Sequence, residues 1–202
     1  MNASTQLTKG STTSERSSRM AVTRDERSGL PIMLVQAILV AAALCIGELI
    51  SAPIYTTLQP GVFPLLPWAA VAMLLSVAFA YVVGFALLWC AESFAYRLNA
   101  KIQPLIYAII GAIAFAVWTV WVVLGIMNSI LVRVGEPALT SQATTTAAIN
   151  GAVLGLCAFF VAVTITPRLA KYRIAAIIIG VVTVLLAVLG GMVLASMMAA
   201  VA

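Results

Sequence analysis

The stretch IAAIIIGVVTVLLAVLGGMVLASMM, residues 174–198, decides the fold because its 25 residues include no charged side chain. A helix of that length is roughly 38 Å long, which exceeds the hydrocarbon core of a bilayer, roughly 30 Å. Four more apolar runs precede it in the chain. The predicted membrane spans are residues 31–51, 68–91, 104–131, 147–166 and 174–198.

The composition of the whole chain supports the same conclusion. Hydrophobic residues make up 63% of the 202 residues and charged residues only 8%, whereas a soluble domain carries roughly 25% charged residues. So few charges cannot cover the apolar surface of a water-soluble fold, but a bundle in lipid needs no such cover. We predict an all-α membrane protein, a five-transmembrane-helix bundle over residues 30–202, preceded by a disordered, polar and basic tail over residues 1–29.

Lysine and arginine are distributed unevenly among the connections between the spans. Of the 11 such residues, all but Arg133 lie in the tail, in the connection after the second span or in the turn after the fourth. By the positive-inside rule, this distribution predicts that the N-terminus is inside and the C-terminus outside. We attribute the net charge of +5 to membrane orientation rather than to nucleic-acid binding. Compact loops and Ala/Val-rich spans favour a multi-pass protein of a bacterial plasma membrane.

Side chains for common catalytic chemistry are scarce. The chain has no histidine, which removes the commonest general base and metal ligand, and its one aspartate, Asp25, lies in the tail. It also has no P-loop, HExxH, CxxC or GxSxG motif. The sequence therefore predicts a protein that is not an enzyme and that holds no metal and no cofactor. Cys45, Cys90 and Cys157 lie within spans and are interpreted as small buried side chains.

Glu48 is the one acidic residue placed well inside a predicted span, in its outer third. A carboxyl group in a membrane is costly unless it is protonated, paired or in contact with water, and it indicates a functional site by default. Two interpretations stay open: Glu48 reaches the outer interface, or it points into the bundle. In the second case the amides of Gln36 and Asn150, or the charge of Arg133, could contact it. Together with Asn128, these are the candidate contacts for an ion or a substrate.

Small residues recur at four-residue spacing in three spans. Such stripes let membrane helices approach closely, either inside one bundle or against a partner subunit or a second copy. The stripe of the fifth span is the longest, and we expect Gly191 to face another helix at close range. The candidate helix-packing residues are Gly47, Gly151, Gly155, Ala187, Gly191 and Ala195.

Prolines and aromatic residues follow the first span. Pro53 is expected to end or kink the first helix. The uncharged segment 52–67 is expected to lie on the outer surface, with Tyr55, Phe63 and Trp68 in an interfacial aromatic belt.

The sequence is compatible with three functions. The first is a non-catalytic accessory or scaffold subunit of a membrane complex, which fits the absence of catalytic groups and the small-residue stripes. The second is a small transporter, or the membrane subunit of one, that uses Glu48. The third, disfavoured, is a membrane-embedded enzyme acting on lipids. A polar cavity lined by Glu48 would favour transport, and a solid apolar interior would favour the scaffold. The expected partners are the lipid bilayer and other membrane subunits or further copies of the chain.

Overall fold

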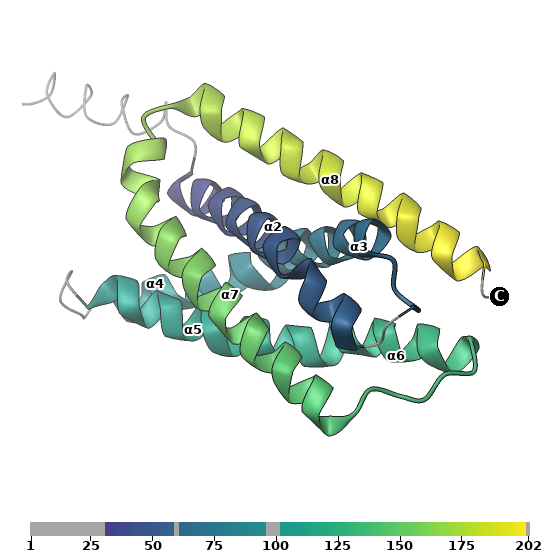
Figure 1. The fold of residues 1–202 in the computed structure, drawn as a ribbon. Coiled ribbons are helices and arrows are strands. Elements are labelled where there is room, and N and C mark those ends of the chain that lie inside the picture. The colour runs from purple at the N-terminus through teal and green to yellow at the C-terminus, as the bar shows by residue number, and fades with distance from the viewer. Residues whose placement is uncertain (1–30, 59–60, 96–101, 201–202) are drawn as a thin grey trace, which may run out of the picture. The chain divides into compact units, whose positions relative to one another are not determined.

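The structure is a computed structural model that describes residues 31–58, 61–95 and 102–200, with the main chain alone over 92–95. The tail predicted over residues 1–29 lies outside the described residues. Within the described ranges every regular element is a helix (Figure 1). The elements are α2 (Ile32–Leu58), α3 (Leu65–Ala78), η1 (Phe79–Gly84), α4 (Phe85–Ala95), α5 (Gln103–Trp118), η2 (Thr119–Val123), α6 (Leu124–Arg133), α7 (Ser141–Leu169) and α8 (Arg173–Ala200).

Five continuous helical stretches are long and apolar enough to cross a membrane, as the sequence predicts. α3, η1 and α4 follow one another without a break and form one such stretch, and α5, η2 and α6 form another. The five candidate spans are Ile32–Leu58, Leu65–Ala91, Gln103–Arg133, Ser141–Leu169 and Arg173–Ala200.

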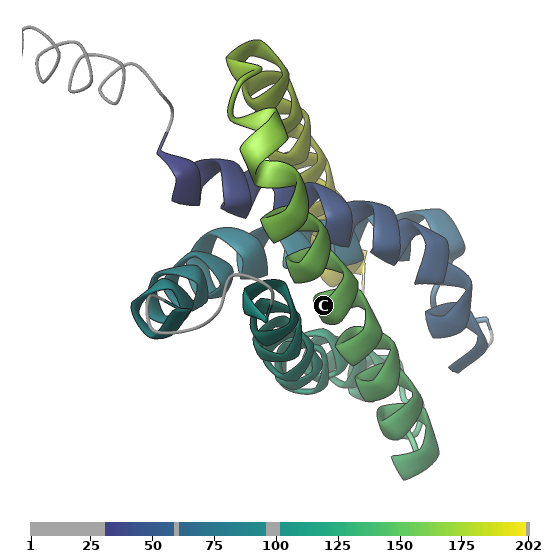
Figure 2. The same cartoon turned by 90° about the vertical axis from the view of Figure 1, so that its left-hand side faces the viewer.

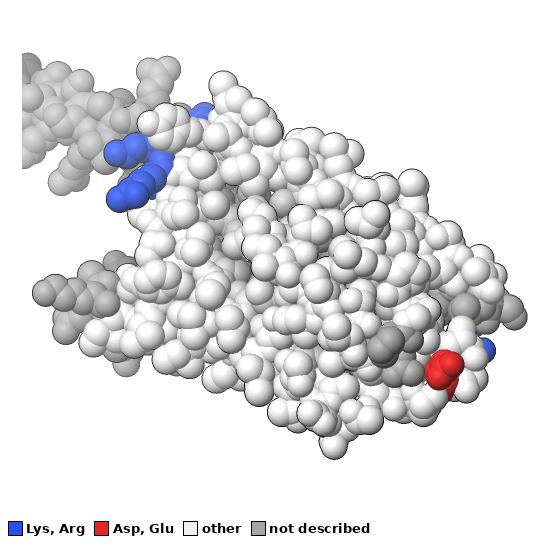
Figure 3. All heavy atoms as spheres, viewed as in Figure 1, with Lys and Arg blue, Asp and Glu red and all other residues white. Residues whose placement is uncertain are grey.

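The two ends of the bundle differ in charge. The start of α2, the end of α4 and the turn from α7 to α8 share one end, and the ends of α2, α6 and α8 share the other (Figure 1). Three of the four described basic residues, Arg168, Lys171 and Arg173, belong to the first end, and Glu136 follows α6 at the second (Figure 3). The alternation matches the charge pattern of the sequence, while the side of the membrane that each end faces stays a prediction.

Of the two outcomes expected at Pro53, a helix end is wrong, because the first helix continues beyond it. α2 continues to Leu58, and the side chain of Pro53 is exposed on its outer face. Beyond the proline, the hydroxyl groups of Thr56 and Thr57 donate to the carbonyl oxygens of Pro53 and Ile54 at 2.9 and 2.7 Å. These bonds stay within the last turn, so the threonines are satisfied without leaving the helix.

The fourth span begins six residues earlier than predicted. Thr140 caps α7, because its hydroxyl oxygen accepts a hydrogen bond from the Ala143 amide at 3.2 Å. Thr144, Thr145 and Thr146 follow within the first turns, and each hydroxyl group donates to the carbonyl oxygen four residues earlier. A run of threonines that looked like loop sequence is therefore helical.

Two segments, η1 and η2, are π-helical, and the sequence analysis did not predict them. They interrupt the second and third spans beside one cluster of aromatic rings. In this cluster the Phe79 ring lies 4.9 Å from the Phe115 ring and 5.7 Å from the Trp118 ring, between centroids. Wide turns of this kind occur most often as single turns within α-helices.

Glycines make the closest helix contacts. A Cβ atom built at Gly155 of α7 would lie 2.7 Å from the Phe115 Cβ atom of α5, and one at Gly47 of α2 would lie 2.6 Å from Leu154 of α7. Gly151 likewise meets Thr119, with a Cβ-to-Cβ distance of 2.9 Å. These positions pack within the bundle.

α8 makes its close contact one residue before the predicted position. A Cβ atom at Gly190 would lie 2.8 Å from the Leu74 Cβ atom and would also overlap the main chain of Ala70 on α3. A Cβ atom at Gly191 would meet nothing within 4 Å. Gly191 therefore faces no helix of this bundle at close range, because one residue turns a helix by about 100°; a close contact with a helix of another chain stays a prediction.

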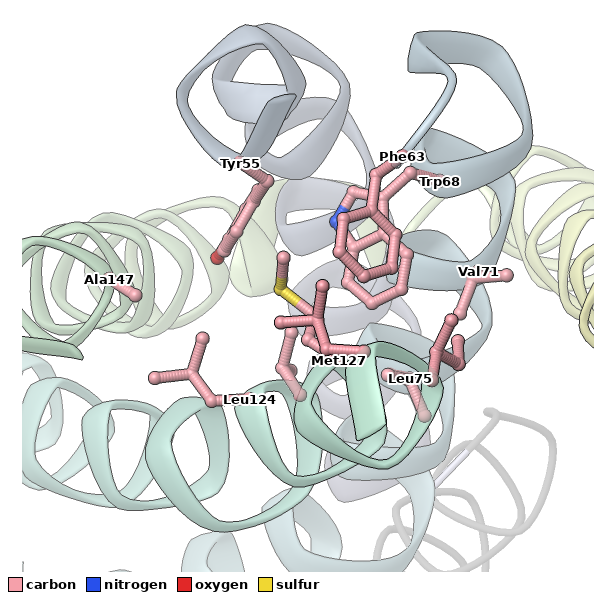
Figure 4. Packing of buried hydrophobic residues seen from close by; sticks show 11 residues of the cluster. Tyr55, Phe63, Trp68, Val71, Leu75, Leu124, Met127 and Ala147 are labelled. Atoms are coloured by element: carbon pink, nitrogen blue, oxygen red, sulfur yellow. The ribbon is translucent and has the colours of Figure 1, made fainter. Parts of the chain in front are cut away.

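The aromatic belt expected after the first span is also wrong. Tyr55, Phe63 and Trp68 are all buried, and they pack around Met127 of α6 in one apolar cluster (Figure 4). The Phe63 and Trp68 ring centroids are 4.9 Å apart. The three rings therefore fill an apolar core at this end of the bundle instead of lining the membrane–water interface.

Candidate functional site

The polar site of this protein is built on one face of α2. Glu48, Ser51 and Tyr55 stand three and four residues apart, the spacing that aligns side chains along a helix. Their exposed fractions are 1%, 5% and 0%. Glu48 therefore lies inside the bundle, not at the lipid surface or the interface.

The hydroxyl groups of Ser51 and Tyr55 are the hydrogen-bond neighbours of the Glu48 carboxyl group. The Ser51 hydroxyl also donates to the Gly47 carbonyl oxygen at 2.9 Å. The Tyr55 hydroxyl accepts a hydrogen bond from the Asn150 side-chain amide at 3.3 Å, so its own proton is free to donate.

Asn150 reaches the site from α7 and joins it indirectly. From the sequence, an amide was a candidate to contact the carboxyl group directly. The structure instead places Tyr55 between them, so that amide, phenol and carboxyl group form a chain across the α2–α7 contact. Gly47, one residue before Glu48, packs against Leu154 of α7 and holds the two helices together there.

The site has an unpartnered atom and no described counter-charge. Oε2 of Glu48 is buried and has no hydrogen-bond partner. Arg133, the one described basic residue at that end of the bundle, is exposed, and no ion pair joins it to Glu48 or Glu136. An unsatisfied polar atom in an apolar interior costs on the order of 1–3 kcal/mol of folding stability. The unpartnered Oε2 atom therefore destabilises the folded protein by an amount of this order.

Two other polar candidates lie elsewhere. Gln36 stands twelve residues before Glu48 on α2, roughly 18 Å along the helix, and does not join the site. Asn128 is occupied: its side-chain oxygen accepts a hydrogen bond from the Leu139 amide at 3.0 Å and fixes the connection between α6 and α7.

Ser51 and Tyr55 are the site residues that sequence reasoning missed. Their signal was present, because the spacing from Glu48 places them on its helical face. It was obscured by the assignment of Tyr55 to a loop after an early helix end.

The metal-binding and cysteine chemistry of the described residues is limited. Among these residues no three His, Cys, Asp or Glu side chains come together in a group that could hold a metal ion. Cys45 is buried, but Cys90 and Cys157 are exposed, which corrects the expectation that all three are buried. All three thiols are free.

The carboxyl group of Glu48 can hold a proton, and the hydrogen bond between Asn150 and Tyr55 ties α7 to α2. Comparison with protein-family models, curated proteins and solved structures found no match. By helix length and hydropathy the chain is a candidate multi-pass membrane protein in contact with a lipid bilayer.

Proposed function

We propose that this chain is a non-catalytic accessory or scaffold subunit of a membrane complex. The observation that supports the proposal is the enclosure of Glu48, the one buried acidic group among the described side chains. Glu48 is 1% exposed and its neighbour Tyr55 is fully buried, whereas a transport site must exchange its cargo with water. The apolar cluster around Tyr55, Trp68 and Met127 closes this region as a packed core does.

The outer face of α8 is the surface that would meet a partner. α8 is the least buried of the five candidate spans. α8 contacts α3 of the same chain through Gly190. A Cβ atom at Gly191 meets no residue of the bundle, and Ala195 is exposed on the neighbouring face. Small side chains there would let a helix of another subunit approach α8 closely.

Leucine substitutions on α8 test the proposal. The full-length protein is isolated from its native membrane in mild detergent, and native mass spectrometry measures the mass of the complex. We expect a defined stoichiometric complex that Gly191→Leu dissociates while the chain stays folded. Val188→Leu is the matched control, since Val188 is 57% exposed and already bulky. A wild-type chain that is monomeric and unaccompanied, or a complex that Gly191→Leu leaves intact, contradicts the proposal.

A small proton-coupled transporter is the second candidate, and the unpartnered Oε2 atom of Glu48 is the observation in its favour. Proteoliposomes loaded with a pH-sensitive dye separate the two functions. Transport requires a proton flux in the wild type that Glu48→Gln abolishes and Gln36→Leu preserves. A scaffold subunit gives no flux in any of the three.

A further inference from the structure

α7 and α8 diverge after their shared turn and leave an apolar groove on the side of the bundle. α7 packs against α5, whereas α8 packs against α3, so α7 and α8 separate along their length (Figures 1 and 2). The groove has a volume of about 430 Å³, within the usual range of ligand pockets, roughly 300–1,000 Å³. Small side chains of α2, Ala42 and Ala43, line it together with Val161 of α7 and Ile178 and Val182 of α8.

The few polar atoms along the groove are turned to other partners. The Thr183 hydroxyl donates to the Gly180 carbonyl oxygen at 2.8 Å and lies 3.4 Å from the Tyr81 hydroxyl. The Cys45 thiol lies 3.9 Å from the Met73 carbonyl oxygen. The groove therefore offers its occupant an apolar wall, which suits a hydrocarbon chain.

One end of the groove is basic. A second depression, lined by Lys171, Tyr172 and Arg173, adjoins the groove at Ile178, which lines both. Arg168 lies in the last turn of α7 at the same end of the bundle, and blue side chains gather there in Figure 3. No acidic residue occurs in the sequence after Glu136, so nothing later in the chain offsets this charge.

The dimensions of the path fit a lipid of one leaflet. From Arg173 to Leu186, the deepest lining residue on α8, the helix rises roughly 20 Å. Half of a bilayer core is roughly 15 Å thick, and the headgroup lies beyond it. The turn would therefore meet the headgroup while an acyl chain lies along α8.

We infer that the α2–α7–α8 groove binds one anionic phospholipid, with its phosphate at Lys171 and Arg173 and one acyl chain against Ala43 and Val182. Basic pockets between membrane helices recognise acidic headgroups in this way. The start of α8 adds to the attraction, because the free N–H groups of a helix N-terminus favour anions. An apolar wall that continues into a cationic end matches the two halves of such a lipid, whereas a partner helix has no need of the charge.

Native mass spectrometry of the full-length protein in mild detergent tests the inference. The protein is titrated with palmitoyl-oleoyl phosphatidylglycerol, with phosphatidylcholine of the same chains, and with glycerol 3-phosphate as the headgroup alone. We expect one phosphatidylglycerol bound tightly, phosphatidylcholine bound at least tenfold more weakly, and no binding of glycerol 3-phosphate. Lys171→Gln combined with Arg173→Gln should weaken phosphatidylglycerol binding about thirtyfold, from roughly 1 kcal/mol per basic residue.

Matched variants separate the site from general lipid adhesion. Arg133→Gln removes a cation from the opposite end and should leave binding unchanged. Val182→Trp should fill the groove and abolish the bound lipid, while Val184→Trp should not. These two valines are 48% and 50% exposed, but only Val182 lines the groove. If Val182→Trp does not fold, Ala43→Leu takes its place.

Three results would overturn the inference. They are equal binding of the two phospholipids, binding of glycerol 3-phosphate without chains, and equal effects of Val182→Trp and Val184→Trp. The first would indicate an annular lipid, the second a plain anion site, and the third a groove that no lipid occupies.

Discussion

Replacing Gly155 with alanine should loosen the contact between α5 and α7. The new Cβ atom would lie 2.7 Å from the Phe115 Cβ atom and 2.8 Å from the Gly111 carbonyl carbon. Carbon atoms prefer separations of roughly 3.5–4.0 Å, so the helices must move apart by about 1 Å, which forfeits a quarter to a half of the dispersion energy along the contact. The neighbouring atoms belong to backbone and to a buried Cβ, which cannot rotate away. We expect a loss of about 3 kcal/mol, the upper end of typical overpacking costs.

Gly125→Ala is the matched control for this substitution. Gly125 also lies inside a helix, but a Cβ atom there meets nothing within 4 Å. Alanine is the better helix former by roughly 1 kcal/mol, so this variant should be slightly more stable than the wild type. The free energy of unfolding is measured by titration with sodium dodecyl sulfate in mixed micelles, followed by far-ultraviolet circular dichroism. Equal changes for Gly155→Ala and Gly125→Ala would refute the packing described for α5 and α7.

Three further predictions use simple assays. Glu48→Gln should change the free energy of unfolding by less than about 1 kcal/mol, because the amide keeps the shape and the hydrogen bonds, whereas Glu48→Ala should cost about 2–4 kcal/mol in the same titration; equal losses would show that the hydrogen bonds contribute nothing. Phe115→Ala should cost about 3–5 kcal/mol, while Trp121→Ala, at a position 80% exposed, should cost less than about 1 kcal/mol, and a reversed order would contradict the aromatic cluster. In a cysteine-free background, single cysteines in the tail and near Ala202 should react with a membrane-impermeant maleimide only at the C-terminal position on intact cells, and labelling of the tail would reverse the predicted topology.

The number and nature of the spans could be predicted from the sequence, because long apolar runs have few alternatives to a membrane helix. Their bounds could not. Pro53 and the three threonines at 144–146 are ordinary signs of helix ends, yet both lie inside helices. For the threonines the reason is that their hydroxyl groups bond back to carbonyl oxygens of their own helix.

The candidate site could be predicted only in part, for a related reason. Glu48 stands out in any sequence as an acid within an apolar run, and Asn150 is one of few amides in the spans. The position of Tyr55 can be interpreted in two ways from the sequence, because an amphipathic ring suits either a membrane interface or a core that offers its hydroxyl group a polar partner. Only the contact with α7 decides between them. The choice between Gly190 and Gly191 is similar, because adjacent residues differ in direction but not in composition.

The wide turn η2 changes which residues of the third span share a face. Phe115 and Met127 are both fully buried, although they lie twelve positions apart on either side of η2. In an unbroken α-helix at 100° per residue they would point about 120° apart, whereas a helix that absorbs one surplus residue in a wide turn brings them within about 20°. The third span thus carries one residue more than its packing register needs. Shortening it by one residue within 119–123 would keep both halves in phase, and the same deletion in any other turn would rotate one half out of the core.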